Sequence, residues 1–185
     1  MVFDGIVVVS GVPGSGKTTL ARSLAPLLNL PLISKDAIKE ALFDALGTGD
    51  LEWSENLGRA SHRIMYSLAR DARSAVLESH FWRGVAESEL TEIQRPLLQV
   101  YCRCPLDLAA DRYRNRATSP DRHPGHLPQH QTDKVIERWR STEQLPLELD
   151  APLIEVDTSG HVDVAQLANS IISIGIEGRP RVPHT

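Results

Sequence analysis

An eight-residue segment near the N-terminus constrains this chain more than any other feature. Residues 11–18 read Gly-Val-Pro-Gly-Ser-Gly-Lys-Thr and fit the pattern G-x-x-x-x-G-K-[ST], whose glycines let a backbone curl closely around phosphate oxygens. A buried-strand pattern, Ile6 to Ser10, precedes the segment, and an amphipathic helical pattern, Lys17 to Leu28, follows it. This order of strand, loop and helix predicts a phosphate-binding loop in an α/β fold.

The residues of this loop suit different parts of a nucleoside triphosphate. Lys17 is expected to reach the β- and γ-phosphates, and the Thr18 hydroxyl is a hard oxygen ligand suited to Mg²⁺. The alternative is a glycine-rich turn that only joins a strand to a helix, but lysine is scarce in this chain and one stands at the required place. We therefore expect ATP and Mg²⁺ as cofactors, held by Gly11, Pro13, Gly14, Ser15, Gly16, Lys17, Thr18 and Thr19.

Short apolar runs alternate with helical patterns along most of the chain, which is typical of α/β folds with a parallel sheet. The expected strands cover residues 6–10, 32–33, 75–77, 98–102 and 153–156, and the expected helices cover 17–28, 36–46 and 55–70, with another opening at Pro105 and Leu106. With 185 residues and 41% hydrophobic composition, the chain can bury one good core. We therefore expect a single domain over residues 1–175.

One stretch breaks this alternation. Residues 118–131 hold three prolines, three histidines and a glycine between two helical patterns, a composition typical of a mobile loop. We expect a lid at residues 118–130, called the lid segment below, and a flexible tail at residues 176–185. A metal site built on His123, His126 and His130 is the disfavoured alternative, because no cysteine or carboxylate stands at a matching spacing.

Composition and charge argue against several other functions. The formal net charge of −4 and the sequence pI of about 6.0 do not give the broad positive field that sequence-independent nucleic-acid binding needs. No apolar run reaches the roughly 20 residues of a membrane span, and Met1 to Asp4 carry no positive side chain. We therefore expect a cytoplasmic protein with no membrane partner. Cys102 and Cys104 alternate on one expected strand, so they should be structural thiols on opposite faces.

Several nucleotide-hydrolysing classes lack their characteristic residues in this sequence. A guanine-binding N-K-x-D segment and a D-x-x-G after the third strand are both missing, as is an Asp-Glu pair at the end of an apolar strand. The third strand is followed instead by Glu78-Ser79-His80-Phe81-Trp82-Arg83. One carboxylate followed by polar and aromatic side chains favours the wall of a substrate pocket.

These residues together make the chain resemble the small P-loop kinases, a group that includes polynucleotide 5′-hydroxyl kinases, zeta-toxin kinases and chloramphenicol phosphotransferase. The resemblance covers about residues 5–158 and is carried by residues 11–18, Ser34-Lys35-Asp36, Glu78, and Arg112 with Arg116. It implies an α/β P-loop NTPase kinase fold with a five-stranded parallel sheet in the order 2-3-1-4-5, flanked by helices. The chain departs from the group at Lys35-Asp36-Ala37, where Arg-Asp-Asp is common, and at Glu78, where Asp is common.

The same resemblance suggests roles for individual residues. It implies that Asp36 accepts the proton of an attacking hydroxyl and that Arg112 and Arg116 close over the ATP phosphates. Independently, Asp36 follows the second expected strand, and ligands in open α/β sheets bind at the carboxyl ends of the strands. The alternative is that Asp36 caps the helix that begins after it, a position where Asp is common. We take Asp36, Lys17 and Arg116 as the candidate catalytic residues.

The remaining candidates belong to the acceptor side of the site. Glu78 can hold Mg²⁺ together with Thr18, bind a substrate hydroxyl, or stand as a solvated strand end. Core packing is the alternative to a substrate role for Phe81 and Trp82. The expected substrate-binding set is Lys35, Asp36, Glu78, His80, Trp82 and Arg83.

The function expected from these features is ATP-dependent transfer of the γ-phosphate to a hydroxyl of a small molecule, such as a natural product, antibiotic, sugar or nucleoside. A polynucleotide 5′-hydroxyl kinase is the nearest alternative enzyme. A nucleotide-binding regulator without turnover is the alternative from another class. The sequence leaves open the identity of the acceptor, ATP against GTP as donor, and the oligomeric state.

Overall fold

The computed structural model describes residues 3–120, 122–126, 129–140 and 144–177. Five parallel strands form one sheet, and their order, β2-β3-β1-β4-β5, confirms the predicted order 2-3-1-4-5. Their bounds are β1 Ile6–Ser10, β2 Leu32–Ser34, β3 Ala75–Glu78, β4 Leu97–Arg103 and β5 Leu153–Asp157. All five predicted strands are therefore present, each within two residues of its expected ends.

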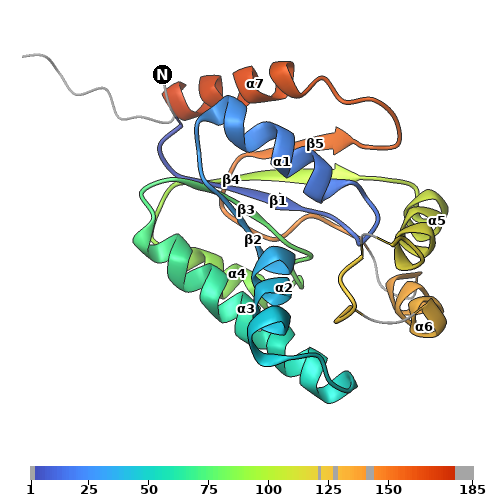
Figure 1. The fold of residues 1–185 in the computed structure, drawn as a ribbon. Coiled ribbons are helices and arrows are strands. Elements are labelled where there is room, and N and C mark those ends of the chain that lie inside the picture. Colours follow the sequence, from blue (N-terminus) through green and yellow to red (C-terminus); the bar gives the residue numbers. More distant parts are fainter. Residues whose placement is uncertain (1–2, 121, 127–128, 141–143, 178–185) are drawn as a thin grey trace, which may run out of the picture.

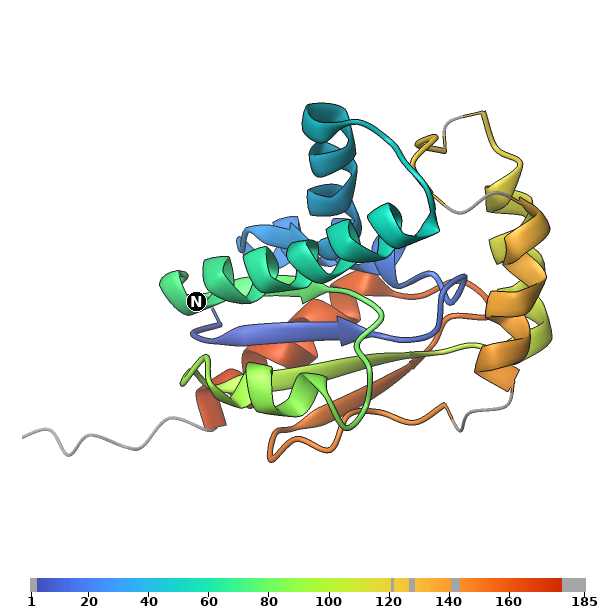
Figure 2. The same cartoon turned by 90° about the horizontal axis from the view of Figure 1, so that it is seen from below.

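Helices cover both faces of the sheet and one of its ends (Figure 1). On one face lie α1 Lys17–Leu28 and α7 Val164–Glu177, and towards the other lie α2 Lys35–Leu46, α3 Leu51–Asp71 and α4 Ala86–Thr91. At the carboxyl ends of the strands stand α5 Leu106–Ala117 and α6 Gln129–Arg140, as the perpendicular view also shows (Figure 2). Among the described residues, no helix combines the length and the apolar character that a bilayer crossing needs.

The central strand β1 supplies side chains to two separate cores. Val7 and Val9 pack with α1 and α7 through residues such as Leu24 and Ile171, whereas Ile6 and Val8 pack with α3 and α4 on the opposite face. This alternation follows from the two-residue period of a strand, and a strand buried on both faces reads as a continuous apolar run. A smaller cluster joins α5 to α6, where the rings of Tyr113 and Trp139 lie 4.9 Å apart.

Apart from shifts of one residue, three boundaries differ from the sequence prediction. Helix α3 begins at Leu51 instead of residue 55, because the Asp50 carboxylate accepts a hydrogen bond from the Trp53 backbone N–H at 2.8 Å and caps the helix earlier. Helix α6 begins at Gln129, inside the expected lid segment, so the expected loop was two residues too long. Helix α7 continues to Glu177, inside the expected tail, and residues 178–185 lie outside the described residues.

Candidate functional site

The loop at residues 11–18 leaves β1 and enters α1, as its motif predicts. Gly14 and Gly16 have φ angles of +82° and +86°, a backbone conformation that side-chain-bearing residues rarely adopt. A Cβ at Gly14 would overlap the Ala109 carbonyl oxygen of α5, so that position requires glycine for a second reason. The Ser15 hydroxyl is fully buried and has no hydrogen-bond partner among the described residues. A hydroxyl without a partner inside a curled backbone fits a loop built for an anionic ligand.

Glu78 joins the loop to the ends of β2 and β3. Its carboxylate accepts hydrogen bonds from the Thr18 hydroxyl at 2.9 Å and the Ser34 hydroxyl at 2.7 Å. Its Oε1 lies 3.9 Å from Lys17 Nζ. Glu78 is 1% exposed, so the interpretation as a solvated strand end is wrong. The structure brings together the two predicted Mg²⁺ ligands, Thr18 and Glu78, and a magnesium ion fits this oxygen donor set.

Asp36 does not cap α2. The N-cap residue is Ser34, so α2 begins one residue before Asp36, and the capping interpretation is wrong. The Asp36 carboxylate lies 3.1 Å from Lys35 Nζ and keeps 35% of its side chain exposed. Burial alone would raise the pKa of Asp36, but Lys35 and Lys17 together hold it well below its usual range. Asp36 is therefore a stable carboxylate that faces solvent at the edge of the site.

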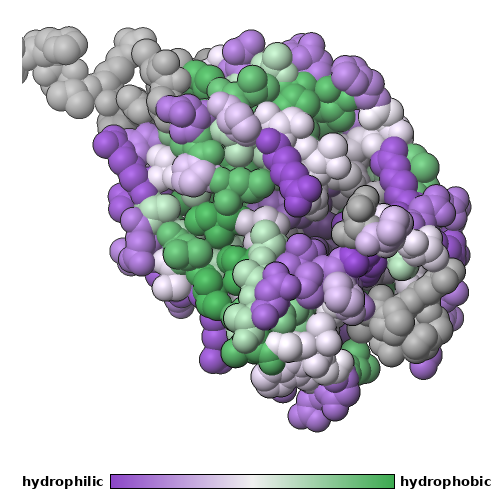
Figure 3. Space-filling model, in the orientation of Figure 1, coloured by the Kyte–Doolittle hydropathy of each residue, from purple (hydrophilic) through white to green (hydrophobic). Residues whose placement is uncertain are grey.

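Lys17, Lys35 and Asp36 line a central cavity together with side chains of helices α3, α5 and α6. Among the described residues, its lining carries six cationic side chains and two carboxylates. These are Lys17, Lys35, Lys39, Arg116, Arg122 and Arg138, against Asp36 and Glu55. The surface is hollowed between α2 and α5, and hydrophilic side chains surround the opening (Figure 3). This local positive charge contrasts with the net charge of −4 for the chain, and it suits a polyanionic ligand such as a triphosphate.

The two arginines that the sequence pairs together have different positions. Arg116 lines the central cavity together with Lys17. Arg112 instead donates to the backbone carbonyl of Thr158 at 2.8 Å and to that of Ser159 at 2.9 Å. It lines another hollow, beside Gly16 and Thr19 of the phosphate-binding loop. Arg112 therefore fixes the segment after β5 next to the loop and is not a wall residue of the central cavity.

Several cavity residues were not among the sequence predictions. Lys39 donates to the Ser54 hydroxyl at 2.8 Å, and burial, with Lys35 nearby, lowers its pKa to about 8. His62 lies 3.0 Å from the Ser79 hydroxyl, and burial lowers its pKa to about 4, so the ring is neutral at physiological pH. Helical spacing could have identified Lys39, one turn after Lys35 in the sequence. His62 and Arg138 carry no such signal, because only the fold brings α3 and α6 to the cavity.

The predicted acceptor wall divides into two parts. His80 and Trp82 line the central cavity, whereas Arg83 lines a neighbouring cavity and forms an ion pair with Glu148. Core packing was the alternative to a substrate role for both aromatic residues. Phe81 is 6% exposed and belongs to the core, so the alternative holds for it, but Trp82 is 43% exposed and does not fit that alternative. Burial, with Lys17 nearby, lowers the pKa of His80 to about 4.

Two histidines of the lid segment contact acidic residues of α2. His126 Nε2 lies 2.7 Å from Glu40 Oε1, and His123 Nε2 lies 3.1 Å from Asp44 Oδ1. The described residues include no group of three or more His, Cys, Asp or Glu that could hold a metal ion. The His130 side chain lies outside the described part of the chain. In these contacts the two histidines hold the lid segment against α2.

The two cysteines do not alternate on one strand as expected, because β4 ends at Arg103. Cys102 is buried in β4, Cys104 lies just beyond it, and both are free thiols. Burial raises the pKa of Cys102 to about 12, so it stays protonated.

Fold and loop together lead to a known family. The family model AAA_33, described as an AAA domain, matches residues 6–142, which is most of the chain. The chain belongs to this family. A solved candidate kinase from Chloroflexus aurantiacus J-10-fl is 31% identical to this AAA_33 chain, with a TM-score of 0.83 over 92% of this chain and 98% of the other. The expected P-loop kinase fold is thereby confirmed.

More distant relatives of this AAA_33 chain also carry kinase names. Cytidylate kinase of Haloarcula marismortui is 31% identical over 121 residues, which is 62% of this chain and 60% of that protein. Cytidylate kinase of Ignicoccus hospitalis is 32% identical over 116 residues, covering 60% and 64%. The chain thus spans less than two thirds of the length of these curated relatives. A gluconokinase from Sinorhizobium meliloti 1021 shares the fold, with a TM-score of 0.62 at 17% identity over 96% of this chain and 94% of the other.

Proposed function

We propose that this protein is an ATP-dependent phosphotransferase that moves the γ-phosphate of ATP to a hydroxyl of a small molecule. The observation that carries the proposal is the position of Asp36. Its carboxylate lies at the end of β2 and shares one cavity with Lys17 of the phosphate-binding loop and with Arg116 of α5. A candidate base, a phosphate-binding lysine and an arginine that face one space are the parts that phosphoryl transfer to a hydroxyl requires.

In the proposed step, the acceptor oxygen forms a bond to the γ-phosphorus while the bond from that phosphorus to the β,γ-bridging oxygen breaks. The hydroxyl proton passes to the Asp36 carboxylate, and ADP leaves with the electron pair. Because Lys35 and Lys17 hold the pKa of Asp36 low, the carboxylate is a weak base. Its main contribution is therefore to orient the hydroxyl, with proton transfer late in the step, as loose phosphoryl-transfer transition states allow.

Some of the charged side chains bind the phosphates of ATP, and others stabilise the phosphoryl group while it is transferred. Lys17 is the ligand for the β- and γ-phosphates, and Arg116 with Arg122 supplies positive charge where the transferring group gains negative charge. Thr18 and Glu78 would hold Mg²⁺, which neutralises phosphate charge when it is bound. The hollow beside Gly16, Thr19 and Arg112 lies on the other side of the loop and is the proposed site for the base of ATP.

The acceptor class has one serious competitor. The central cavity has six cationic side chains and two carboxylates, which is more positive charge than the binding of an uncharged alcohol requires. In addition, the curated relatives are named cytidylate kinases. A phosphate acceptor on a nucleotide is therefore the second candidate. Among hydroxyl acceptors, the resemblance to zeta-toxin kinases, chloramphenicol phosphotransferase and polynucleotide 5′-kinases remains a hypothesis about the subgroup.

An acceptor screen tests the proposal. The protein is incubated with ATP and Mg²⁺ and with pools of alcohols, sugars, nucleosides, antibiotics, nucleoside monophosphates and 5′-hydroxyl oligonucleotides. We expect an acceptor-dependent release of ADP and a mass gain of one phosphoryl group on a small alcohol. The product should resist mild acid, because phosphate monoesters are more stable than the anhydride formed from a phosphate acceptor.

The matched control for this screen is Lys17→Met, which keeps the length of the buried stem and removes the charge. It should lower turnover by orders of magnitude. Its melting temperature shows whether the fold survives, since Lys17 also neighbours the buried Glu78. Acceptor-independent ADP release in every pool would contradict the proposal and indicate an ATPase. No ADP release at all with intact ATP binding would also contradict it and favour a nucleotide-binding regulator.

A further inference from the structure

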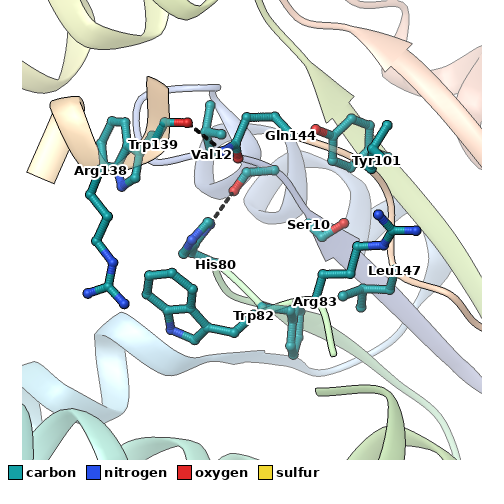
Figure 4. Close-up of a pocket in the computed structure, with 13 residues that line it drawn as sticks. Ser10, Val12, His80, Trp82, Arg83, Tyr101, Arg138, Trp139, Gln144 and Leu147 are labelled. Carbon is teal, nitrogen blue, oxygen red and sulfur yellow. Dashed lines mark hydrogen bonds between the residues drawn. The ribbon is translucent and has the colours of Figure 1, made fainter. Parts of the chain in front are cut away.

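A second cavity adjoins the central one and has no part in the proposed phosphoryl transfer. It lies next to the first residues of the phosphate-binding loop, between the ends of β1 and β4 on one side and the segment at residues 144–147 on the other. His80, Trp82, Arg138 and Trp139 line both cavities. Figure 4 shows His80, Trp82 and Arg138 along one side of this second cavity, with Ser10, Tyr101 and Leu147 on the other. The two cavities are therefore neighbours that share one wall.

Ring contacts hold that shared wall together. The His80 and Trp82 rings meet edge to face with centroids 4.7 Å apart. The Arg138 guanidinium lies 4.8 Å from the centre of the Trp82 ring. His80 Nδ1 lies 3.3 Å from the Gly11 carbonyl oxygen, which ties the wall to the phosphate-binding loop. A ligand that contacts Trp82 from the central cavity therefore lies next to the second cavity as well.

The interior of the second cavity is aromatic and contains a polar group without a partner. Ser10 is 4% exposed, and its hydroxyl has no hydrogen-bond partner among the described residues. Tyr101 is 8% exposed on the same lining, and burial, with Glu155 nearby, raises the pKa of its hydroxyl. Buried hydroxyls are almost always paired in folded proteins. The Ser10 hydroxyl is therefore a position where a ligand can supply the missing partner.

The charge of the second cavity differs from that of the central one. Arg83 is paired with Glu148, and Arg138 rests on the Trp82 ring. The rest of the described lining is apolar, aromatic or neutral polar, with Phe81, Trp139 and Leu147 among it. Such a lining suits a flat, uncharged ring with one hydrogen-bonding group, because aromatic faces favour stacked or edge-to-face ring contacts.

We propose that the second cavity binds an uncharged planar ring of the acceptor, with a polar group of that ring hydrogen-bonded to the Ser10 hydroxyl. The acceptor then extends past the edge of the shared His80 and Trp82 side chains, so that its reactive hydroxyl lies beside Asp36 in the central cavity. This inference rests on the proposed function and narrows its acceptor to aromatic or heteroaromatic alcohols, nucleosides included. Simple polyols, which have no ring to place there, should be poor acceptors.

Binding measurements on the intact protein test this inference. The ring-bearing probes are tyrosol, tryptophol, uridine and cytidine, and the ringless comparison is erythritol. Saturation-transfer NMR and calorimetric titration give the dissociation constants in the presence of ADP and Mg²⁺. We expect at least one ring-bearing alcohol to bind tenfold or more tightly than erythritol, and Ser10→Ala to weaken that binding about threefold to tenfold.

Thr132→Val is the matched control. Thr132, on α6, also has a buried hydroxyl with no partner among the described residues, but it does not line the second cavity. Its substitution should leave the dissociation constants unchanged. Ser10→Ala should melt no lower than the wild type without ligand, because it removes a polar group that is already unpaired. A merely structural role for Ser10 would instead lower the melting temperature and leave ring binding alone.

The outcomes separate this inference from the proposed function. Phosphoryl transfer to erythritol or a similar polyol at a rate that Ser10→Ala does not change would overturn the ring site and leave the proposed function standing. Failure of every ring-bearing probe to bind saturably would also overturn it. Ring binding that depends on Ser10, found without any phosphoryl transfer, would support the site and count against the proposed function.

Discussion

At the scale of single residues, two carboxylates near the loop have opposite environments. Glu78 is 1% exposed and accepts two hydroxyl hydrogen bonds, so its position is fixed. Asp36 has an exposed edge and one lysine partner in the described structure around it. A buried, fully bonded carboxylate suits a constant task such as holding a metal, whereas an accessible one can meet a substrate. These environments favour Asp36 as the group that contacts the acceptor.

Asp36→Asn therefore tests the role of this charge. We expect kcat to fall about 100- to 10,000-fold, because the carboxylate both orients the acceptor hydroxyl and takes its proton. The dissociation constant for ATP should stay within a few-fold. Asparagine keeps the size of the side chain, and Asp36 is not the N-cap residue of α2, so the melting temperature should change little. Steady-state kinetics, ATP titration and thermal denaturation give the three quantities.

Glu55→Gln is the control for the Asp36 variant, since Glu55 is the other carboxylate among the described cavity residues. It should change kcat much less, because Glu55 is on α3, away from the strand end that faces the loop. Near-normal kcat in Asp36→Asn would show that Asp36 is not the base. Loss of ATP binding in that variant would show that Asp36 holds Lys35 and Lys17 in place for ATP. Asp36 would then not act on the acceptor.

At the scale of elements, the described part of the lid segment packs against α2. His123 stacks on Phe43 with ring centroids 5.5 Å apart, and a Cβ at Gly125 would overlap the same phenyl ring. Arg122, from the same segment, lines the central cavity. The contacts with α2 therefore place an arginine of the lid segment beside Arg116 and the acceptor site. Closure of this segment remains a prediction, and we expect His126 to make that closure sensitive to pH.

Lowering the pH should weaken the packing of the lid segment on α2. Burial lowers the pKa of His126 in this position, and this effect outweighs the hydrogen bond to the Glu40 carboxylate, which raises the pKa. The packed segment thus binds fewer protons than the free segment, so packing is strongest above the ordinary histidine pKa of about 6.5 and is lost as the pH falls below it. Hydrogen exchange of residues 122–126 should be faster at pH 5 than at pH 8, after correction for intrinsic rates.

His126→Gln is the control for the pH effect, since glutamine can still donate to Glu40 but does not titrate. Its exchange rate, corrected in the same way, should be nearly independent of pH. Adding a non-hydrolysable ATP analogue and an acceptor should slow exchange in the same residues, because closure over the site excludes water. Equal corrected rates at both pH values in the wild type would contradict the histidine mechanism.

At the scale of the whole molecule, one sheet carries two cores and all the candidate site residues at one end. Strand β1 contributes to both cores and continues directly into the phosphate-binding loop. Neither core can lose its packing without disturbing β1. We therefore expect the two faces to unfold together and the site to be lost with them.

Leu24→Ala tests this cooperativity. Leu24 lies on α1 and is fully buried in the core shared with α7. Removing its side chain should lower the free energy of unfolding by about 2–5 kcal/mol, as large-to-small substitutions in cores do. Urea unfolding followed by tryptophan fluorescence and by circular dichroism should show one transition at the same midpoint. All three tryptophans lie outside the core that Leu24 belongs to: Trp53 is on α3, Trp82 follows β3, and Trp139 is in the cluster of α5 and α6. Separated midpoints would therefore contradict a single unit.

Local sequence was sufficient to predict the phosphate-binding loop and most of the strands and helices. The loop is recognised from eight consecutive residues, and the strands and helices are recognised from the spacing of apolar residues. Both signals lie in residues that are close together in the sequence. The order of the sheet came from the resemblance to the small P-loop kinases. The start of α3 was missed because capping by Asp50 depends on one side-chain hydrogen bond, which periodicity does not report.

The sequence by itself therefore determined the loop that is the candidate phosphate site and the chain segments that form the sheet. Only the tertiary structure decided how the rest of the site is assembled. It placed Glu78 against Thr18 and Ser34, tied Arg112 to the segment after β5, and brought Arg138 and Trp139 of α6 to Trp82. These partners are separated by dozens of residues, and their contacts depend on how helices pack on a sheet. No local pattern records that packing, because it is fixed by the burial of both faces of the sheet at once.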